Sequence, residues 1–270
     1  MVTRKSRQEI EKMRRAGRVV AEVLALVESE LRPGVTAARL DELAERHMQA
    51  TGAVPSFKGY LGGCRYGRGP RAFPASLCIS IDDEVVHGIP DGREIREGQL
   101  VSIDAGAIVD GWHGDGARTF AVGGVAPEAK ALVDATRLAL MAGIAAAQPG
   151  NRIGDIGAAI EDVALSARYG VVRQFVGHGI GTCMHEDPQI PNFRARGDGG
   201  RVIEPGMCLA IEPMFTLGGD DVDVEADGWT VVTRDGALAA HFEHTIAITE
   251  DGPEILTTVG APAFAGDRSV

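Results

Sequence analysis

The sequence predicts an α+β fold: a single domain, residues 1–270, built from two related halves at about residues 7–125 and 126–256. Three observations favour this fold. Apolar residues recur at helical spacing in two pairs of segments, and short apolar runs typical of strands lie between them. The order of motifs in the first half also recurs in the second, so the halves are expected to pack around a pseudo-twofold axis.

The first helix is expected at about residues 7–31. Ser6 and Glu9 have the spacing of a capping box, and apolar residues then follow a helical period. A Pro-Gly pair ends this helix. Thr36 can cap a second helix, which is expected to run to Gly52.

A loop is expected at residues 53–75, which are rich in glycine and aromatic residues. Apolar runs after this loop are typical of strands. These strands are expected at about residues 77–82, 100–104, 107–110 and 117–122.

The second half repeats this order, with a long helix at about residues 127–147 and a shorter helix that runs to Gly170. Three motifs occupy equivalent positions in the two halves. They are His87-Gly-Ile and His178-Gly-Ile, the segments 95–104 and 203–212, which match without a gap, and Asp110-Gly-Trp112 and Asp227-Gly-Trp229. Asp104 therefore aligns with Glu212, and the site is expected where such matched residues converge.

Composition limits the classes of partner and compartment. The net charge of −11 and the pI near 5.1 argue against binding to nucleic acid or to an anionic membrane, and small neutral or cationic partners fit better. No signal peptide and no membrane-spanning apolar stretch are found, so a cytoplasmic protein is expected. No C-x-x-C pair occurs, and all four cysteines are expected to be free thiols, namely Cys64, Cys78, Cys183 and Cys208.

Two carboxylates, Asp104 and Asp115, are the first candidates for chemistry. Asp104 follows an apolar run of the kind that forms a buried strand, and a buried carboxylate is costly unless charge or hydrogen bonds offset it. Gly-Trp-His-Gly, residues 111–114, is expected to be a turn, so a hairpin could place Asp115 against Asp104. Because two inward carboxylates repel each other, this pair predicts a metal ion.

The matched positions extend this pair to four carboxylates and one imidazole, which are Asp104, Asp115, His178, Glu212 and Glu243. Two ions about 3.5–4 Å apart, bridged by Asp115 and Glu243, would satisfy this much negative charge, and a water held between them would be a nucleophile for hydrolysis. Two imidazoles in Gly- or Pro-flanked loops, His87 and His185, are suited to hold an oxyanion or a substrate amide.

A lone acid or histidine is more often a surface or structural residue than a ligand. That interpretation is weakened for Asp104, Glu212 and Glu243, because each lies in an apolar run and two of them occupy equivalent positions. Glycines around His178 likewise favour a close approach to a ligand. The remaining candidates are interpreted as loop acids or as histidines that are not ligands, namely Glu186, Asp187, His113, His241 and His244.

Seven motifs together resemble type I methionine aminopeptidases, over about residues 7–256. They are His87-Gly-Ile-Pro, Ile103-Asp104, Gly111-Trp-His-Gly-Asp115, Gly177-His-Gly-Ile-Gly, His185-Glu-Asp-Pro, Ile211-Glu-Pro-Met and Phe242-Glu-His-Thr. The resemblance implies the pita-bread fold, in which two antiparallel-sheet halves are covered by helices. It also implies removal of the initiator methionine from nascent chains when the next residue is small, by the short bacterial form of the enzyme.

The resemblance assigns a role to each residue of the site. It implies two divalent ions held by Asp104, Asp115, His178, Glu212 and Glu243. Co, Mn, Fe and Zn all accept such a carboxylate-rich site, so the sequence does not identify the metal. Glu212 would also assist as a base, His185 would stabilise the tetrahedral intermediate, and His87 would contact the scissile amide or the leaving amine. The expected partners are N-termini of nascent peptides at the ribosome, and a monomer is expected.

The same resemblance implies a methionine pocket lined by Phe57, Tyr60, Phe73, Cys78, Met184 and Trp229. A thioether packs well against aromatic and sulfur groups. This sequence departs from the family by an insert of twelve residues, Leu61 to Ala72, so that either Tyr60 or Tyr66 could line the pocket. Met184 replaces a more usual aromatic residue, which is expected to soften the selectivity for the side chain.

Two other functions are considered. An X-Pro peptidase of the same fold would use much the same five ligands, but such enzymes usually carry a large N-terminal domain, whereas about six residues precede the first expected helix. A metal-free relative that serves as a binding module is the other alternative, and the presence of all five ligands argues against it.

Overall fold

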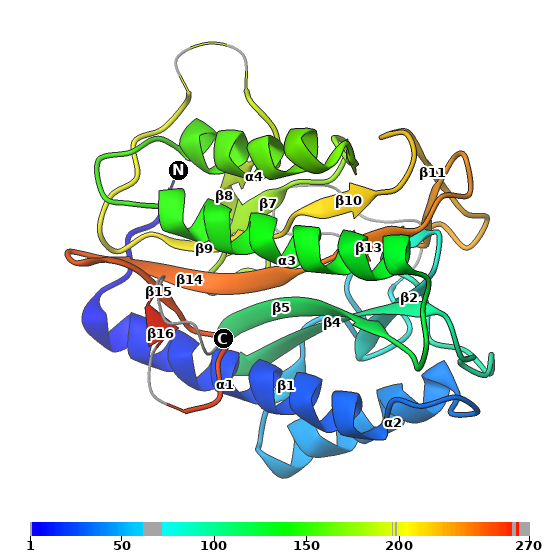
Figure 1. The fold of residues 1–270 in the computed structure, drawn as a ribbon. Helices are drawn as coiled ribbons and strands as arrows, with labels where there is room; N and C mark the ends of the chain where they lie inside the picture. The colour runs from blue at the N-terminus through cyan, green and yellow to red at the C-terminus, as the bar shows by residue number, and fades with distance from the viewer. Residues whose placement is uncertain (1, 62–71, 196, 198, 261–262, 265–270) are drawn as a thin grey trace.

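The structure is a computed structural model that describes residues 2–61, 72–195, 197, 199–260 and 263–264. Four helices, in two pairs far apart in the sequence, are the most prominent elements (Figure 1). They are α1 (Arg7–Glu30), α2 (Ala37–Ala50), α3 (Pro127–Ala146) and α4 (Ile153–Ala167). All four expected helices are present, with ends that differ from the predicted ones by a few residues.

Sixteen strands are assigned in the described part of the chain. Those of the first half are β1 (Val54–Pro55), β2 (Leu77–Ile81), β3 (Glu84–Val86), β4 (Leu100–Val109) and β5 (Trp112–Ala121). Those of the second half are β6 (Gly170–Val171), β7 (Gly177–Gly179), β8 (Glu186–Ile190), β9 (Cys208–Ile211), β10 (Met214–Thr216), β11 (Val222–Val224), β12 (Val231–Thr233), β13 (Ala239–His241), β14 (Glu243–Thr249), β15 (Gly252–Ile255) and β16 (Ala263–Phe264).

The capping box at the start of α1 is confirmed. The Ser6 side chain accepts a hydrogen bond from the Glu9 N–H, and the Glu9 carboxylate accepts one from the Ser6 N–H at 2.7 Å. Two of the donors that a helix start leaves unpaired are thereby satisfied. At α2 the Thr36 side chain accepts a hydrogen bond from the Arg39 N–H at 3.2 Å, which confirms the predicted cap.

The hairpin of β4 and β5 differs from the prediction in two respects. β4 is one unbroken strand instead of two, and β5 begins at Trp112, five residues before the predicted start. The turn consists of Asp110 and Gly111, with φ of 50° and 80°, so the prediction of a turn over all of Gly-Trp-His-Gly was wrong. A two-residue Asp-Gly turn needs positive φ at both positions and allows pairing to continue right up to it.

The main sheet joins the two halves of the chain. Its order is β1-β4-β5-β14-β9-β7-β8, and all pairs on this path are antiparallel. The hairpin of the first half therefore lies beside the strands β14 and β9 of the second half, and the two halves meet at the β5–β14 pair. Figure 1 shows β5 and β14 crossing the centre of the molecule between the two helix pairs.

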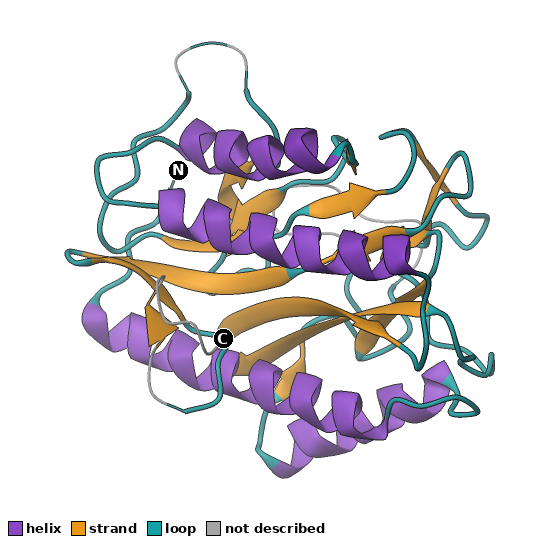
Figure 2. Ribbon diagram, in the orientation of Figure 1, coloured by secondary structure: helices purple, strands orange, loops and turns teal. Residues whose placement is uncertain are grey.

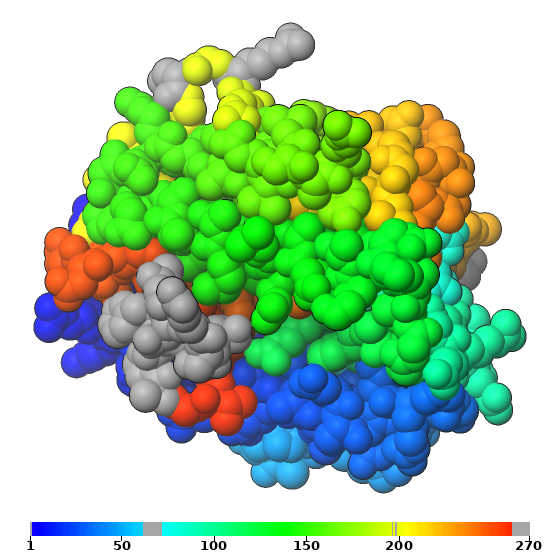
Figure 3. All heavy atoms as spheres, viewed as in Figure 1, coloured from blue at the N-terminus to red at the C-terminus, as the bar shows by residue number. Residues whose placement is uncertain are grey.

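Two large apolar cores lie between these helices and the sheet. One packs α1 and α2 against β2 and β4, with Val20, Leu40 and Ile103 fully buried. The other packs α3 and α4 against β9 and β14, with Leu140 and Ile246 buried. Figure 2 shows the helices in front of the strands, and Figure 3 shows side chains filling the space between the ribbons. Among the described helices, none is both long and apolar enough to cross a bilayer.

One cysteine differs from the prediction. Cys78 and Cys208 are buried free thiols, as expected, whereas Cys183 is disulfide-bonded. The prediction that every cysteine is free was therefore wrong, because spacing within the sequence cannot detect a pair that only the fold brings together. Cys64 lies outside the described residues.

Helix α1 crosses β5 with almost no space between the two backbones. A Cβ atom added at Gly114 would lie 2.6 Å from the Gly17 nitrogen and 2.8 Å from the Ala16 carbonyl carbon. A Cβ added at Gly17 would in turn lie 2.4 Å from the Leu256 oxygen. Only glycine allows this approach, which fixes the helix directly against the strand that contains Asp115.

Gly114→Ala is expected to lower the free energy of unfolding by about 1–3 kcal/mol, because neither backbone can move away without disturbing its own core. Gly92→Ala is the matched control, since nothing lies within 4 Å of a Cβ at this position. Urea denaturation of both variants measures the difference. Equal stability of the two variants would contradict the proposed backbone contact.

Candidate active site

A cavity of about 100 Å³ lies where the two halves meet. Its lining consists of Phe57, Tyr60, Phe73, Cys78, His87, Asp104, Asp115, His178, Met184, His185, Glu212, Trp229 and Glu243. The structure thus brings together every residue that the sequence predicts for metal binding, for catalysis and for the methionine pocket. Their individual roles stay predictions.

Strand register places the acidic residues on one face of the sheet. Asp104 of β4 pairs with Ala117 of β5, and Ala117 pairs with Glu243 of β14, so these three residues form a row across the strands. Asp115 lies two residues before Ala117 and shares its face. The methyl group of Ala117 occupies little space, which allows the carboxylates on either side to approach each other. Glu212 follows the last residue of β9 and completes the group.

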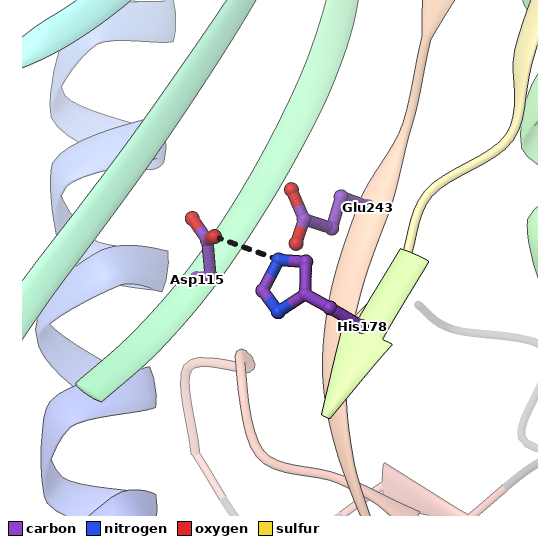
Figure 4. A group of neighbouring side chains, drawn as sticks. All are labelled: Asp115, His178 and Glu243. Carbon is purple, nitrogen blue, oxygen red and sulfur yellow. Dashed lines mark ion pairs between the residues drawn. The ribbon is translucent and has the colours of Figure 1, made fainter. Parts of the chain in front are cut away.

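The side chains of Asp115, His178 and Glu243 have ligand atoms that all lie within 4.8 Å of one another (Figure 4). Figure 4 shows that they come from three separate strands and point toward one another. The His178 Nε2 atom is 3.5 Å from Glu212 Oε1 and 3.9 Å from Asp115 Oδ2. Asp104 and Asp115 lie on the two paired strands of one hairpin, close enough for the charge of Asp104 to raise the pKa of Asp115, which confirms that the hairpin brings these two carboxyl groups together.

Burial strongly disfavours negative charge at this place. It raises the pKa of Asp104 to about 7. Burial and the charges of neighbouring carboxylates raise the pKa values of Asp115, Glu212 and Glu243 well above their usual range. One buried oxygen each of Asp104, Asp115 and Glu243 has no hydrogen-bond partner among the described residues. Buried oxygens without donors, in a group of four acids, fit a divalent cation.

His178 is prepared to act as a ligand by its main-chain neighbour. Its Nδ1 atom is 2.9 Å from the carbonyl oxygen of Gly179. Because a carbonyl can only accept, Nδ1 carries the ring proton, and Nε2 keeps its lone pair directed at the acids. Burial lowers the pKa of His178 to about 4, so the ring is neutral, as a metal ligand must be.

His185 and His87 line the same cavity as the acids but are not among the predicted metal ligands. The His185 ring is 4.3 Å from the His178 ring, between centroids, and its Nδ1 atom is hydrogen-bonded to the Tyr60 hydroxyl. Burial lowers the pKa of His185 to about 2 and that of His87 to about 4, so both are neutral hydrogen-bonding groups. His87 has a φ of 61° and packs edge-on against Phe175, at 5.5 Å.

The other end of the cavity is apolar. Phe57, Phe73, Cys78 and Met184 form a buried cluster, and Tyr60 and Trp229 pack against it. Phe73 meets Trp229 edge-on at 5.3 Å. Cys78 pairs with Asp104 across β2 and β4, so the apolar end adjoins the acidic end through strand register. Tyr60 lines the cavity, whereas Tyr66 and most of the insert lie outside the described residues.

Several neighbours of the site were not found from the sequence. Ile89 and Ala75 belong to the apolar cluster, and the position of Ile89 in the His87-Gly-Ile-Pro motif was the signal that could have identified it. His241, interpreted as a non-ligand, has its buried Nε2 atom 3.9 Å from Glu212 Oε2 and 4.0 Å from Glu243 Oε2. His244, also interpreted as a non-ligand, has its Nδ1 atom 2.7 Å from Thr257 Oγ1.

Comparisons with known proteins agree with this geometry. The model of metallopeptidase family M24 matches residues 11–250. The methionine aminopeptidase of Clostridium acetobutylicum is 48% identical over 258 residues, which cover 95% of this chain and 99% of that protein. The crystal structure of methionine aminopeptidase from Thermotoga maritima has a TM-score of 0.89 and 44% identity, and the match covers 96% of this chain and all of that one.

A prolidase from Pyrococcus furiosus also matches, with a TM-score of 0.74 and 22% identity over 96% of this chain and 66% of that one. At this identity the likeness shows the fold alone. The expected pita-bread fold is confirmed by both structures. The chain therefore belongs to metallopeptidase family M24, and within it to the methionine aminopeptidases, whose sequences it matches over nearly its whole length.

Proposed function

We propose that this aminopeptidase removes the N-terminal methionine from nascent proteins whose second residue is small. The observation that supports this proposal best is the cavity with two unlike ends, in which an apolar cluster adjoins a group of four acids and a histidine. A methionine side chain suits the apolar end, because a flexible thioether packs against aromatic and sulfur groups. The scissile amide would then lie beside the acids.

The acids and His178 would hold the metal. Two divalent ions, of Co, Mn, Fe or Zn, are proposed, because one ion rarely balances four carboxylates, and Asp115 and Glu243 would be among the residues that hold them. When bound, the metal supplies Lewis-acid polarisation of the scissile carbonyl and lowers the pKa of the attacking water.

The remaining polar groups would act on the substrate directly. Glu212 would accept a proton from the attacking water, since burial and the charges of Asp115 and Asp104 raise its pKa well above its usual range and make it a stronger base. When the Tyr60 hydroxyl donates to Nδ1 of His185, the Nε2 atom carries the ring proton and can donate to the oxyanion of the tetrahedral intermediate. His87 would contact the scissile amide or the leaving amine.

The partners follow from the substrate. N-terminal methionine is generated by translation, so we propose that the enzyme acts in the cytoplasm on nascent chains at the ribosome. We also propose a monomer with a single domain, because the residues that line the cavity come from both halves of one chain.

A peptide assay tests the function. Met-Ala-Ser is expected to be cleaved at its first bond with added divalent metal, and Ala-Ala-Ser is expected to be cleaved at least about a hundredfold more slowly, because alanine leaves the apolar pocket empty. Release of the first residue is measured by chromatography with Mn, Fe(II), Co and Zn in turn. Cleavage of an X-Pro peptide series in preference to Met-Ala-Ser would favour the prolidase-like alternative instead.

Metal binding and turnover are expected to separate in two variants. Asp104→Asn should weaken metal binding, because it removes a charge from the acid row, whereas His185→Ala should keep the metal and lower kcat about 10²–10³-fold. Asp110→Asn is the control, since this acid is exposed at the turn of the same hairpin. Metal content and kcat are measured together, and equal loss of metal from both variants would contradict the separation.

Metal affinity is expected to depend on pH. Because burial raises the pKa of Asp104 to about 7, the metal-free site carries protons below that pH, and these must leave when the metal binds. The affinity for Mn²⁺ should fall about tenfold per pH unit for each proton released, between about pH 7 and pH 6. Calorimetry in buffers of different ionisation heat measures both quantities. Constant affinity without proton release would show that the acids are already ionised.

A further inference from the structure

A largely buried charged pair outside the cavity, Lys5 and Glu186, connects the N-terminal residues to the loop that carries His185. Lys5 is 7% exposed although it precedes the first helix. Its Nζ atom is 2.9 Å from Glu186 Oε2, and the side chains of both residues are largely shielded from water. Burying an ammonium group is costly unless it is paired, so this pair is a specific feature of the fold and not a surface contact.

Both oxygens of the Glu186 carboxylate accept hydrogen bonds. Thr3 Oγ1 donates to Oε2 at 2.6 Å, beside Lys5. Burial alone would raise the pKa of Glu186, but the hydrogen bonds from Thr3 and Lys5 outweigh it and lower the pKa below its usual value. The other oxygen, Oε1, accepts the Cys183 N–H at 3.4 Å. Glu186 therefore joins the N-terminal segment to the main chain that precedes His185.

The loop closes tightly over this pair. A Cβ atom added at Gly181 would lie 2.4 Å from Glu186 Oε1 and 2.8 Å from Lys5 Cε, so the loop backbone is packed directly on the two charged groups. The carbonyl of Gly181 accepts the N–H of His113 at 2.9 Å, which ties the same loop to β5. Two residues of this loop, Met184 and His185, line the cavity.

The N-terminal segment is itself fixed to the second half. The Lys5 N–H donates to the carbonyl of Gly206 at 2.6 Å, and the Gly206 N–H donates to the carbonyl of Ile248 in β14. Gly206 has a φ of 91°, and a Cβ there would lie 3.0 Å from the Lys5 oxygen. The backbone of Lys5 is thus anchored to β14, and its side chain reaches from this anchor to Glu186.

We propose that Lys5 is a positioning residue, which acts through Glu186 to hold the loop of residues 181–185 so that His185 and Met184 face the substrate. The inference rests on the proposed function, in which His185 stabilises the tetrahedral intermediate. Without Lys5, the largely buried Glu186 carboxylate loses one of its hydrogen-bond donors. The loop then shifts so that water can reach the carboxylate. A displacement of about 1 Å at a catalytic group is enough to cost up to about 10² in rate.

The test compares Lys5→Met, Glu186→Gln and the double variant with wild type, using Met-Ala-Ser and added Mn²⁺. Methionine keeps much of the volume of lysine and removes its charge. Each single variant is expected to lower kcat about ten- to a hundredfold per folded, metal-loaded molecule, with a smaller change in KM. The double variant is expected to lose no more than the singles, because the two residues act as one unit.

Arg4→Met is the matched control. Arg4 is the residue before Lys5, its side chain is exposed, and its Nη1 atom lies 4.0 Å from Glu204 Oε1. It is expected to retain wild-type kcat. Bound metal and the folded fraction are measured for every variant by metal analysis and by circular dichroism. If Lys5→Met does not fold, Thr3→Val removes one donor to Glu186 from an exposed position and is expected to lower kcat in the same direction by a smaller factor.

The outcomes separate this inference from the proposed function. Wild type that fails to release methionine would overturn the function. If wild type is active, an unchanged kcat in folded Lys5→Met would overturn the role of Lys5. If Lys5→Met does not fold, an unchanged kcat in folded Thr3→Val would overturn it. A loss that follows only the fraction unfolded, or only the loss of metal, would also overturn it, since either result marks a merely structural contact. A loss of kcat in folded, metal-loaded protein supports the inference.

Discussion

The collection of four carboxyl groups in one buried cavity is the constraint on which the rest of the structure depends. Asp104 and Glu243 lie in one row across three strands with only Ala117 between them, and Asp115 shares their face. Like charges so close and so poorly solvated cannot all ionise without a cation. The β5–β14 pair has to hold them together nonetheless, and Thr245 helps by both accepting from the Asp115 N–H and donating to its carbonyl oxygen.

The strands that bring the acids together also contribute to the apolar end of the cavity. β4 contributes Asp104, and its partner β2 places Cys78 directly opposite, so one register sets how far the acids lie from the apolar end of the cavity. A shift of β2 by one residue against β4 would turn Cys78 to the other face of the sheet, away from Asp104. In the proposed function, selectivity for an N-terminal methionine and cleavage of the bond after it would therefore both depend on this strand pairing.

Residue patterns predicted all four described helices and most of the site, because a capping box, helical spacing and matched motifs are local or repeated signals. Ser6 and Glu9, for instance, cap α1 as expected, and Asp104 and Asp115 meet across a hairpin as expected. What the patterns missed depends on tertiary contacts. The disulfide of Cys183 cannot be read from spacing, because its partner is chosen by the fold. Glu186 was interpreted as a loop acid, because its partner Lys5 lies 181 residues away.

Much of what holds the active site lies outside its cavity. Before metal binds, the acids oppose folding, so the surrounding contacts must fix their strands without help from the site itself. The close approach of Gly17 to Gly114 holds α1 on β5, and the Lys5–Glu186 pair holds the loop of residues 181–185. These contacts differ in kind. The glycine contact supports the strand that contains Asp115, so its loss should reduce stability and metal binding together. The charged pair supports His185, which is not a predicted ligand, so its loss should reduce turnover while the metal stays bound.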